Sequence, residues 1–169
     1  SEIGRNWMPA IGIVGDASLV LGQLLQEVRQ HHRVPAGMDS PRVHELLAHK
    51  TRLLAEVDVE CSTDEFPFAA KRVVHEASKV FNGNTILVNE NGSQDSWSYF
   101  YPFYTVANGS SCVTVAEQTC MGMGIVGAIA AKLAEPSKNV VCVTGDGAFQ
   151  MYMKELPTAA QYRAGCTWI

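Results

Sequence analysis

The chain has 169 residues, of which 47% are hydrophobic and 18% are charged, so it can bury a core and does not have the composition of a disordered chain. A net charge of −4 argues against a nucleic-acid or anionic-membrane surface. The longest apolar run, residues 121–131, is too short to cross a bilayer, and no signal peptide is visible. The five cysteines form no CxxC pair, which indicates buried thiols in a reducing cytoplasm rather than disulfides or a zinc site.

The first third of the chain predicts a strand–helix pair and then a second helix. Residues 11–14 form a short apolar run, which predicts a buried strand. Asp16 is the expected N-cap of a helix whose apolar stripe runs over residues 17–28, and residues 34–37 break that helix. Ser40 and Pro41 open the next helix, as N-cap and first helical residue. A domain boundary is expected within residues 34–65.

The remainder alternates helices and strands. Helices are predicted from Pro67 to Phe81, over residues 121–134 and over residues 148–163, and a long aromatic loop spans residues 89–111. The predicted strands are residues 85–88, 112–115, 139–144 and 166–169. This alternation predicts an α/β fold, a parallel sheet flanked by helices. Because the last predicted strand runs to the final residue, we expect the chain to be a fragment.

The strongest chemical signal is a glycine-flanked aspartate, Gly145-Asp146-Gly147, between a buried strand and a helix. Glycines let a backbone approach a ligand, and the N–H groups at a helix start attract anions. An aspartate there suits a phosphate only if a divalent cation bridges the two, so Asp146 is a candidate ligand for Mg²⁺. The alternative is a β-turn in which Asp146 only caps the helix.

Residues 145–162 closely resemble the diphosphate-binding motif of thiamine-diphosphate-dependent enzymes, in the group of acetolactate synthase and benzoylformate decarboxylase. The resemblance implies a thiamine-diphosphate-binding fold with Mg²⁺ held by Asp146. It also implies that the cofactor diphosphate lies against Gly145, Asp146, Gly147 and Ala148. The family motif closes with two asparagines, which would lie a few residues beyond Ile169 and include the second metal ligand.

Two further segments are similar to the same family. Residues 117–136 resemble its aminopyrimidine-binding segment, which implies that Thr119 offers a backbone carbonyl and that Met121 props the bent cofactor. The chain departs from the family by having Glu117 and Thr119 where glycines are usual. Packing in the core is the alternative for Met121, Met123 and Ile125. Residues 85–95 resemble the other diphosphate loop, with Gly92, Ser93 and Gln94 as candidates. Glu90 could face the substrate or be a solvated loop acid.

The resemblance also implies an organisation and an activity. Residues 1–35 are expected to end a Rossmann-like middle domain, residues 36–65 to form a linker, and residues 66–169 to be an incomplete cofactor domain. The expected reaction makes or breaks a C–C bond beside a carbonyl of a 2-keto or 2-hydroxyacyl substrate. Within the family, residues 88–95, 116–118 and 155–157 resemble 2-hydroxyacyl-CoA lyases more than acetolactate synthases. The family's activating glutamate lies in a domain absent here, so no catalytic residue is assigned, and the full-length protein is expected to be a homodimer or homotetramer.

Two rival interpretations remain open. Gly122, Gly124 and Gly127 form a G-x-G-x-x-G pattern, and Asp146 follows at about the distance of the acid in dinucleotide-binding Rossmann domains. Against this, the glycines do not directly follow the predicted strand. The other rival is a non-catalytic module of the same fold, against which the intact Asp146 argues.

Overall fold

A computed structural model of the chain describes residues 2–31, 40–99, 101–106, 109–114 and 118–169. The chain divides into two compact units, Ser1–Ala48 and His49–Ile169, and the division falls inside helix α2 (Pro41–Glu60). The predicted helix break at residues 34–37 lies outside the described residues, and the predicted division into residues 1–35, 36–65 and 66–169 stays a prediction.

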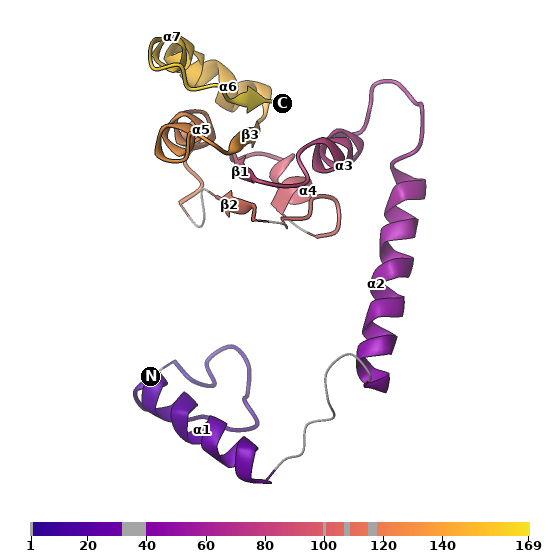
Figure 1. Cartoon of the computed structure of the whole chain (residues 1–169), viewed down its shortest axis with the longest axis vertical. Coiled ribbons are helices and arrows are strands. Elements are labelled where there is room, and N and C mark those ends of the chain that lie inside the picture. Colours follow the sequence, from indigo (N-terminus) through magenta and orange to yellow (C-terminus); the bar gives the residue numbers. More distant parts are fainter. Residues whose placement is uncertain (1, 32–39, 100, 107–108, 115–117) are drawn as a thin grey trace. The chain divides into compact units, whose positions relative to one another are not determined.

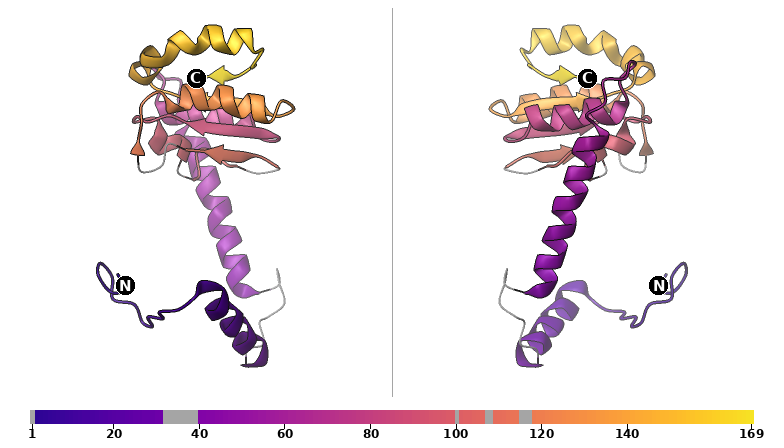
Figure 2. Two further views of the ribbon diagram at one scale, coloured as in Figure 1. Left: turned by 90° about the vertical axis from the view of Figure 1, so that its left-hand side faces the viewer. Right: turned by 90° about the vertical axis from the view of Figure 1, so that its right-hand side faces the viewer.

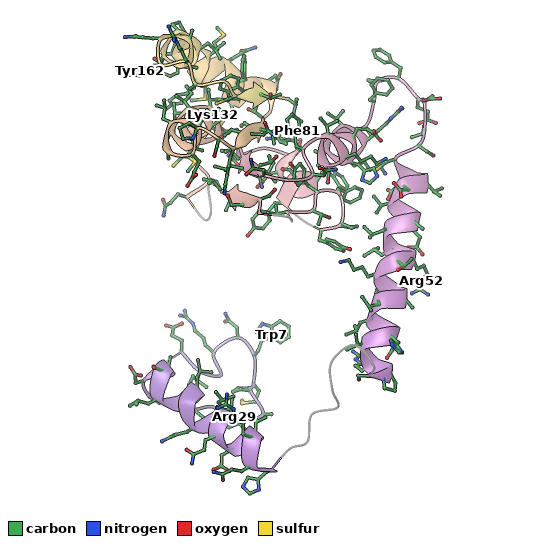
Figure 3. The ribbon with its side chains drawn as sticks, in the orientation of Figure 1. Trp7, Arg29, Arg52, Phe81, Lys132 and Tyr162 are labelled. Atoms are coloured by element: carbon green, nitrogen blue, oxygen red, sulfur yellow. The ribbon has the colours of Figure 1, made fainter. Side chains whose placement is uncertain are left out.

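The first unit is built on helix α1 (Ala17–His31), and none of its residues is buried. The Leu19 N–H donates to Asp16 Oδ1 at 3.1 Å, so the predicted N-cap is confirmed. The predicted strand at residues 11–14 is wrong: these residues are irregular and exposed. A strand needs a hydrogen-bonded neighbour, and no described strand pairs with this run. Trp7 is likewise 87% exposed, and Figure 3 shows its side chain projecting from the segment before α1.

The second unit contains a four-stranded sheet in the order β2-β1-β3-β4, and all its strand pairs are parallel. The predicted parallel α/β fold is therefore confirmed. Its strands are β1 (Thr85–Asn89), β2 (Ser111–Val113), β3 (Asn139–Val143) and β4 (Thr167–Trp168). Its helical segments after α2 are α3 (Ala70–Val80), α4 (Asp95–Tyr99), α5 (Met123–Ala134), α6 (Asp146–Tyr152), η3 (Met153–Glu155) and α7 (Leu156–Gln161).

Helices cover both faces of the sheet, which explains why the central strands lack an alternating pattern. On one face, Leu87 and Val141 pack with Val74 of α3, and on the other face Ile86 and Val140 pack with Ala128 of α5. Figure 1 shows α3 and α5 on opposite sides of the sheet, and Figure 2 shows the run of α6 and α7 lying along α5.

Three predicted helices differ in their limits, and the one expected over residues 121–134 begins at Met123. The helix expected from Pro67 begins at Ala70, after an N-cap residue, Ala69, that has no side-chain oxygen. The helical stretch expected over residues 148–163 begins at Asp146 and tightens into η3 before α7. Pro157 lies in the first turn of α7, and a proline there cannot donate to the preceding turn, which accounts for the interruption. No described helix is both long and apolar enough to span a membrane.

Candidate functional site

The candidate site lies where the strand order of the sheet reverses. From β1 the chain crosses to β2 on one side, whereas from β3 it proceeds to β4 on the other side. The loops that follow β1 and β3 therefore leave adjacent strands in opposite directions. In open parallel sheets, such a switch point opens a crevice beyond the carboxyl ends of the strands, where ligands bind.

The loop after β1 reaches the loop after β3 through Gln94. The Gln94 Nε2 donates to the Glu90 carbonyl at 3.1 Å, which fixes the side-chain amide. Its Oε1 lies 2.3 Å from where a Cβ on Gly92 would be and 3.2 Å from where a Cβ on Gly145 would be. The Gln94 amide therefore occupies the space beside both glycines, and Ser93 is exposed in the turn between Gly92 and Gln94. The structure brings these predicted residues together.

Asp146 opens α6 but does not cap it. The N-cap is Gly145, and the Asp146 Oδ1 accepts only the neighbouring Gly147 N–H, at 2.8 Å. The alternative that Asp146 is an N-cap is therefore wrong, and its carboxylate is exposed at the carboxyl end of β3. Among the described residues, no group of three or more His, Cys, Asp or Glu side chains could hold a metal ion, so side chains of these types alone do not form a metal site around Asp146. Ala148, also predicted to contact the diphosphate, is buried in the first turn of α6 and is only 2% exposed.

A pocket opens beside Asp146. It is lined by residues from the end of β3, the first turn of α6 and the end of β4: Thr144, Gly145, Asp146, Phe149, Trp168 and Ile169. The Ile169 N–H donates to the Cys142 carbonyl at 2.9 Å, and the Thr144 N–H donates to the Ile169 carbonyl at 2.8 Å. The last residues of the chain are thus hydrogen-bonded directly beside the Gly-Asp-Gly turn.

The turn before α5 forms a further wall of the site. The Met121 Cε lies 3.7 Å from where a Cβ on Gly147 would be, which places Met121 against the Gly-Asp-Gly turn. Met121 is 42% exposed, so the core-packing alternative is wrong for it, although Ile125 is a core residue. Thr119 has φ +43°, in the left-handed region that favours glycine. This explains why a glycine would fit position 119 with less strain; Glu117 lies outside the described residues.

Sequence reasoning missed the burial of Glu90. The expectation of a solvated loop acid is wrong, because Glu90 is completely buried. Its Oε1 accepts the Asn91 N–H and its Oε2 accepts the Gly124 N–H, both at 2.8 Å. One sequence signal could have found it: α5 begins with glycines and has no Ser, Thr, Asp or Asn to cap it, so an acceptor from elsewhere was required.

The Glu90 contact also bears on the dinucleotide-binding alternative. In a dinucleotide fold, the N–H groups at the start of the glycine-rich helix receive the pyrophosphate. Here the Gly124 N–H is already bonded to a carboxylate of the protein. Gly122, the N-cap of α5, is moreover closed off by the Tyr152 ring, which lies 1.8 Å from where a Cβ on Gly122 would be. The start of α5 is therefore not an open anion site.

Comparison with known proteins agrees with the geometry. Residues 91–169 match the family described as thiamine pyrophosphate enzyme, C-terminal TPP binding domain. Proteins named as acetolactate synthase large subunits match over 96% of the chain, with 28% identity in Methanococcus aeolicus and 32% in Methanocaldococcus jannaschii. The protein YdaP of Bacillus subtilis, whose name describes it as containing thiamine pyrophosphate, is 28% identical over 99% of the chain. The chain spans 28%, 27% and 28% of the lengths of these three relatives.

Proposed function

We propose that this chain, which belongs through residues 91–169 to the family of C-terminal thiamine-pyrophosphate-binding domains, holds thiamine diphosphate at the switch point between β1 and β3. The observation that carries the proposal is that Gln94 joins the loops after these two strands beside Gly145. The cofactor diphosphate would lie against Gly92, Ser93, Gln94, Gly145, Asp146, Gly147 and Ala148. The aminopyrimidine would meet the Thr119 carbonyl, with Met121 as the prop.

A magnesium ion fits this arrangement only together with the diphosphate. Asp146 offers one exposed carboxylate, and a Mg²⁺ ion prefers six oxygen ligands. Because no group of three or more His, Cys, Asp or Glu side chains that could hold a metal ion occurs among the described residues, a cation at Asp146 needs phosphate oxygens and water. This is how Mg²⁺ is usually held beside phosphate groups, by one or two carboxylates and the phosphates themselves. We therefore propose that Asp146 is a metal ligand of the loaded site.

The proposed activity is the making or breaking of a C–C bond beside a carbonyl. Thiamine diphosphate, when bound, supplies the carbanion chemistry for such a reaction. The residues described above bind and orient the cofactor, and none of them is assigned as a general acid or base. The relatives' names favour an acetolactate-synthase-like reaction on a 2-keto acid, and a 2-hydroxyacyl-CoA lyase-like reaction is the alternative. A homodimer or homotetramer and a cytoplasmic location stay predictions.

The metal proposal is tested by Asp146→Ala and Asp146→Asn in the full-length natural protein. Both variants remove the charge, and asparagine keeps an oxygen for the Gly147 N–H. We expect the Mg²⁺-dependent affinity for thiamine diphosphate to fall by about 10- to 100-fold in both, the usual effect of losing a charged polar contact. The unfolding midpoint without cofactor should stay nearly the same in Asp146→Asn, which keeps an acceptor for the Gly147 N–H, and should fall only slightly in Asp146→Ala, which loses it.

Calorimetric titration with cofactor and Mg²⁺, together with thermal unfolding, measures both effects. Glu135→Gln is a suitable control, because Glu135 is an exposed acid at the far end of α5. A variant of Asp146 that binds cofactor with wild-type affinity would show that the metal assignment is wrong. The 169-residue chain alone is expected to bind thiamine diphosphate weakly and to have no lyase activity, and measurable turnover by it would contradict that expectation.

A further inference from the structure

Glu90 is hydrogen-bonded to three segments that border the candidate site. Its backbone N–H donates to the Val143 carbonyl at 3.1 Å, at the end of β3, and its carbonyl accepts Gln94 Nε2. Its carboxylate accepts the N–H groups of Asn91 and Gly124. One buried residue therefore connects the loop after β1, the end of β3 and the start of α5.

The carboxylate acts as a cap for α5 supplied from another element. The N-cap of α5 is Gly122, which has φ +89° and no side chain that could accept a hydrogen bond. The Met123 and Ile125 N–H groups donate to the carbonyls of Cys120 and Gly122, whereas the Gly124 N–H between them donates to Glu90. The carboxylate of Glu90 satisfies the Gly124 N–H and places a negative charge at the positive end of the helix dipole. Because an unpaired buried polar group is costly, this contact specifies one position of α5 relative to β1.

Gly124 permits that position by its lack of a side chain. A Cβ on Gly124 would lie 2.8 Å from Glu90 Cβ and 3.1 Å from Glu90 Cα. The start of α5 thus approaches the end of β1 more closely than it could if any residue other than glycine stood at position 124. The turn that immediately precedes α5 carries Thr119 and Met121, so its position depends on the same contact.

We propose that Glu90 is a positioning residue that sets the spacing between the diphosphate-binding turns and the aminopyrimidine-binding turn. This inference rests on the proposed function. It predicts that Glu90 matters for a ligand that spans both turns and not for one that occupies the diphosphate turns alone. Glu90 acts through the backbone of α5 and touches no reacting atom.

The test compares two ligands in the full-length protein: thiamine diphosphate with Mg²⁺, and inorganic pyrophosphate with Mg²⁺. Glu90→Gln keeps the volume of the side chain but leaves one of the two N–H groups without an oxygen. We expect its affinity for thiamine diphosphate to fall about tenfold or more while its affinity for pyrophosphate stays the same. Amide exchange of Gly124 should accelerate in the same variant.

A second variant keeps the inference testable if Glu90→Gln fails to fold. Gly124→Ala keeps the carboxylate but pushes α5 away from it, so it should show the same difference between the two ligands. Gly127→Ala in the same helix is its matched control, since a Cβ there would make ordinary contacts of 3.5 Å with Met123 Sδ and 3.6 Å with Val88 Cγ1. Glu135→Gln controls for loss of a charge.

The outcomes are distinct. Equal losses for both ligands would mean that Glu90 only stabilises the fold, and unchanged affinity for thiamine diphosphate would also overturn the inference. If the wild-type protein binds neither ligand, the proposed function fails and the positioning role fails with it. A selective loss for thiamine diphosphate in Glu90→Gln or Gly124→Ala, with both controls unchanged, would support the inference.

Discussion

Helices α1 and α5 are both rich in apolar residues, but only α5 is packed. Leu21, Leu24 and Leu25 of α1 are exposed, and no residue of that helix is buried. Ile125, Ala128 and Ile129 of α5 are buried against the sheet or against the residues that follow it along the chain. An apolar stripe therefore predicts a helix in both units, whereas burial depends on whether other elements cover that stripe.

Two predicted strands, one in each unit, also differ in whether other elements cover them. Residues 11–14 and residues 85–88 are both short and apolar, but only the second run becomes a strand, β1, which pairs with β2 and β3. A central strand requires neighbours on both sides, and the first unit provides none among its described residues. Matched substitutions in the two units should therefore have different effects on stability.

The largest expected difference is between two leucine truncations. Leu87→Ala in β1 removes a side chain that is 1% exposed, and we expect the free energy of unfolding to fall by about 3 kcal/mol. Leu24→Ala in α1 removes one that is 57% exposed, and we expect a change below about 0.5 kcal/mol. Urea denaturation of each variant measures the difference. Equal losses would mean that α1 is packed as tightly as β1.

Two glycine substitutions should have opposite signs. Gly122 has φ +89°, and a Cβ on it would lie within the Tyr152 ring, so Gly122→Ala should lower the free energy of unfolding by about 2–3 kcal/mol. In α1, a Cβ on Gly22 would meet nothing within 4 Å. Gly22→Ala should therefore raise the helicity of α1, with a gain of about 0.5–1 kcal/mol.

Denaturation curves and far-ultraviolet circular dichroism would report these two effects. A neutral Gly122→Ala would contradict the expected opposite signs. It would mean that the Tyr152 ring and the turn before α5 can move apart with little loss of stability. The double variant Gly122→Ala with Tyr152→Ala should recover part of the lost stability, because removing the ring removes the steric clash with the new Cβ.

The third prediction concerns pH. Burial raises the pKa of the Asp95 carboxyl above its ordinary value of 3.8, and the charge of Glu90 adds to that rise. As the pH rises from about 3.8, the unfolded carboxyl ionises first, so the folded state loses stability until the pH passes the folded pKa. Asp95→Asn removes this loss, so the variant should be more stable than wild type at neutral pH and lose that advantage in acid.

Thermal unfolding between pH 3 and 8 measures the Asp95 effect, with Asp16→Asn as the control in the first unit. Asp16 is exposed, and its Oδ1 accepts the Leu19 N–H, a role that asparagine also fills. The control should therefore keep the cap of α1 and change the stability at neutral pH little. A gain for Asp95→Asn that is the same at every pH would contradict the proposed origin of the effect.

Much of the second unit could be predicted from the sequence because its signals are local. The continuous apolar runs of β1 and β3, the glycine and asparagine residues that end α3, and the Gly-Asp-Gly turn each depend on residues close together in the chain. Their parallel pairing followed from the alternation with helices. The residues predicted for the site after β1 and β3 lie together for the same reason, since both loops follow carboxyl ends of adjacent parallel strands.

What could not be predicted depends on contacts between distant segments. Glu90 is 34 positions from Gly124, and nothing near it in the sequence indicates that its carboxylate is buried under a helix start. The exposure of the α1 stripe is a similar case, because periodicity does not say which element will cover a face. Pro67 suggested a helix start by its own preference, although the helix begins three residues later, at Ala70.

The smallest expected effect is at Thr119, which has φ +43°. A β-branched residue in the left-handed region is strained by about 1–2 kcal/mol, and glycine removes that strain. Glycine also gives the unfolded chain more freedom, which offsets about 0.5–1 kcal/mol of the gain. Thr119→Gly should therefore change the free energy of unfolding by no more than about 1 kcal/mol, in the stabilising direction.

The matched substitution in the first unit is Ser18→Gly, in the first turn of α1. Its backbone is helical, so glycine relieves no strain there and only adds freedom to the unfolded chain, and the variant should destabilise its helix slightly. Chemical denaturation of both variants measures the change in the free energy of unfolding, which we expect to be a gain for Thr119→Gly and a loss for Ser18→Gly. A clear loss of stability in Thr119→Gly would show that the threonine side chain makes contacts that outweigh its backbone strain.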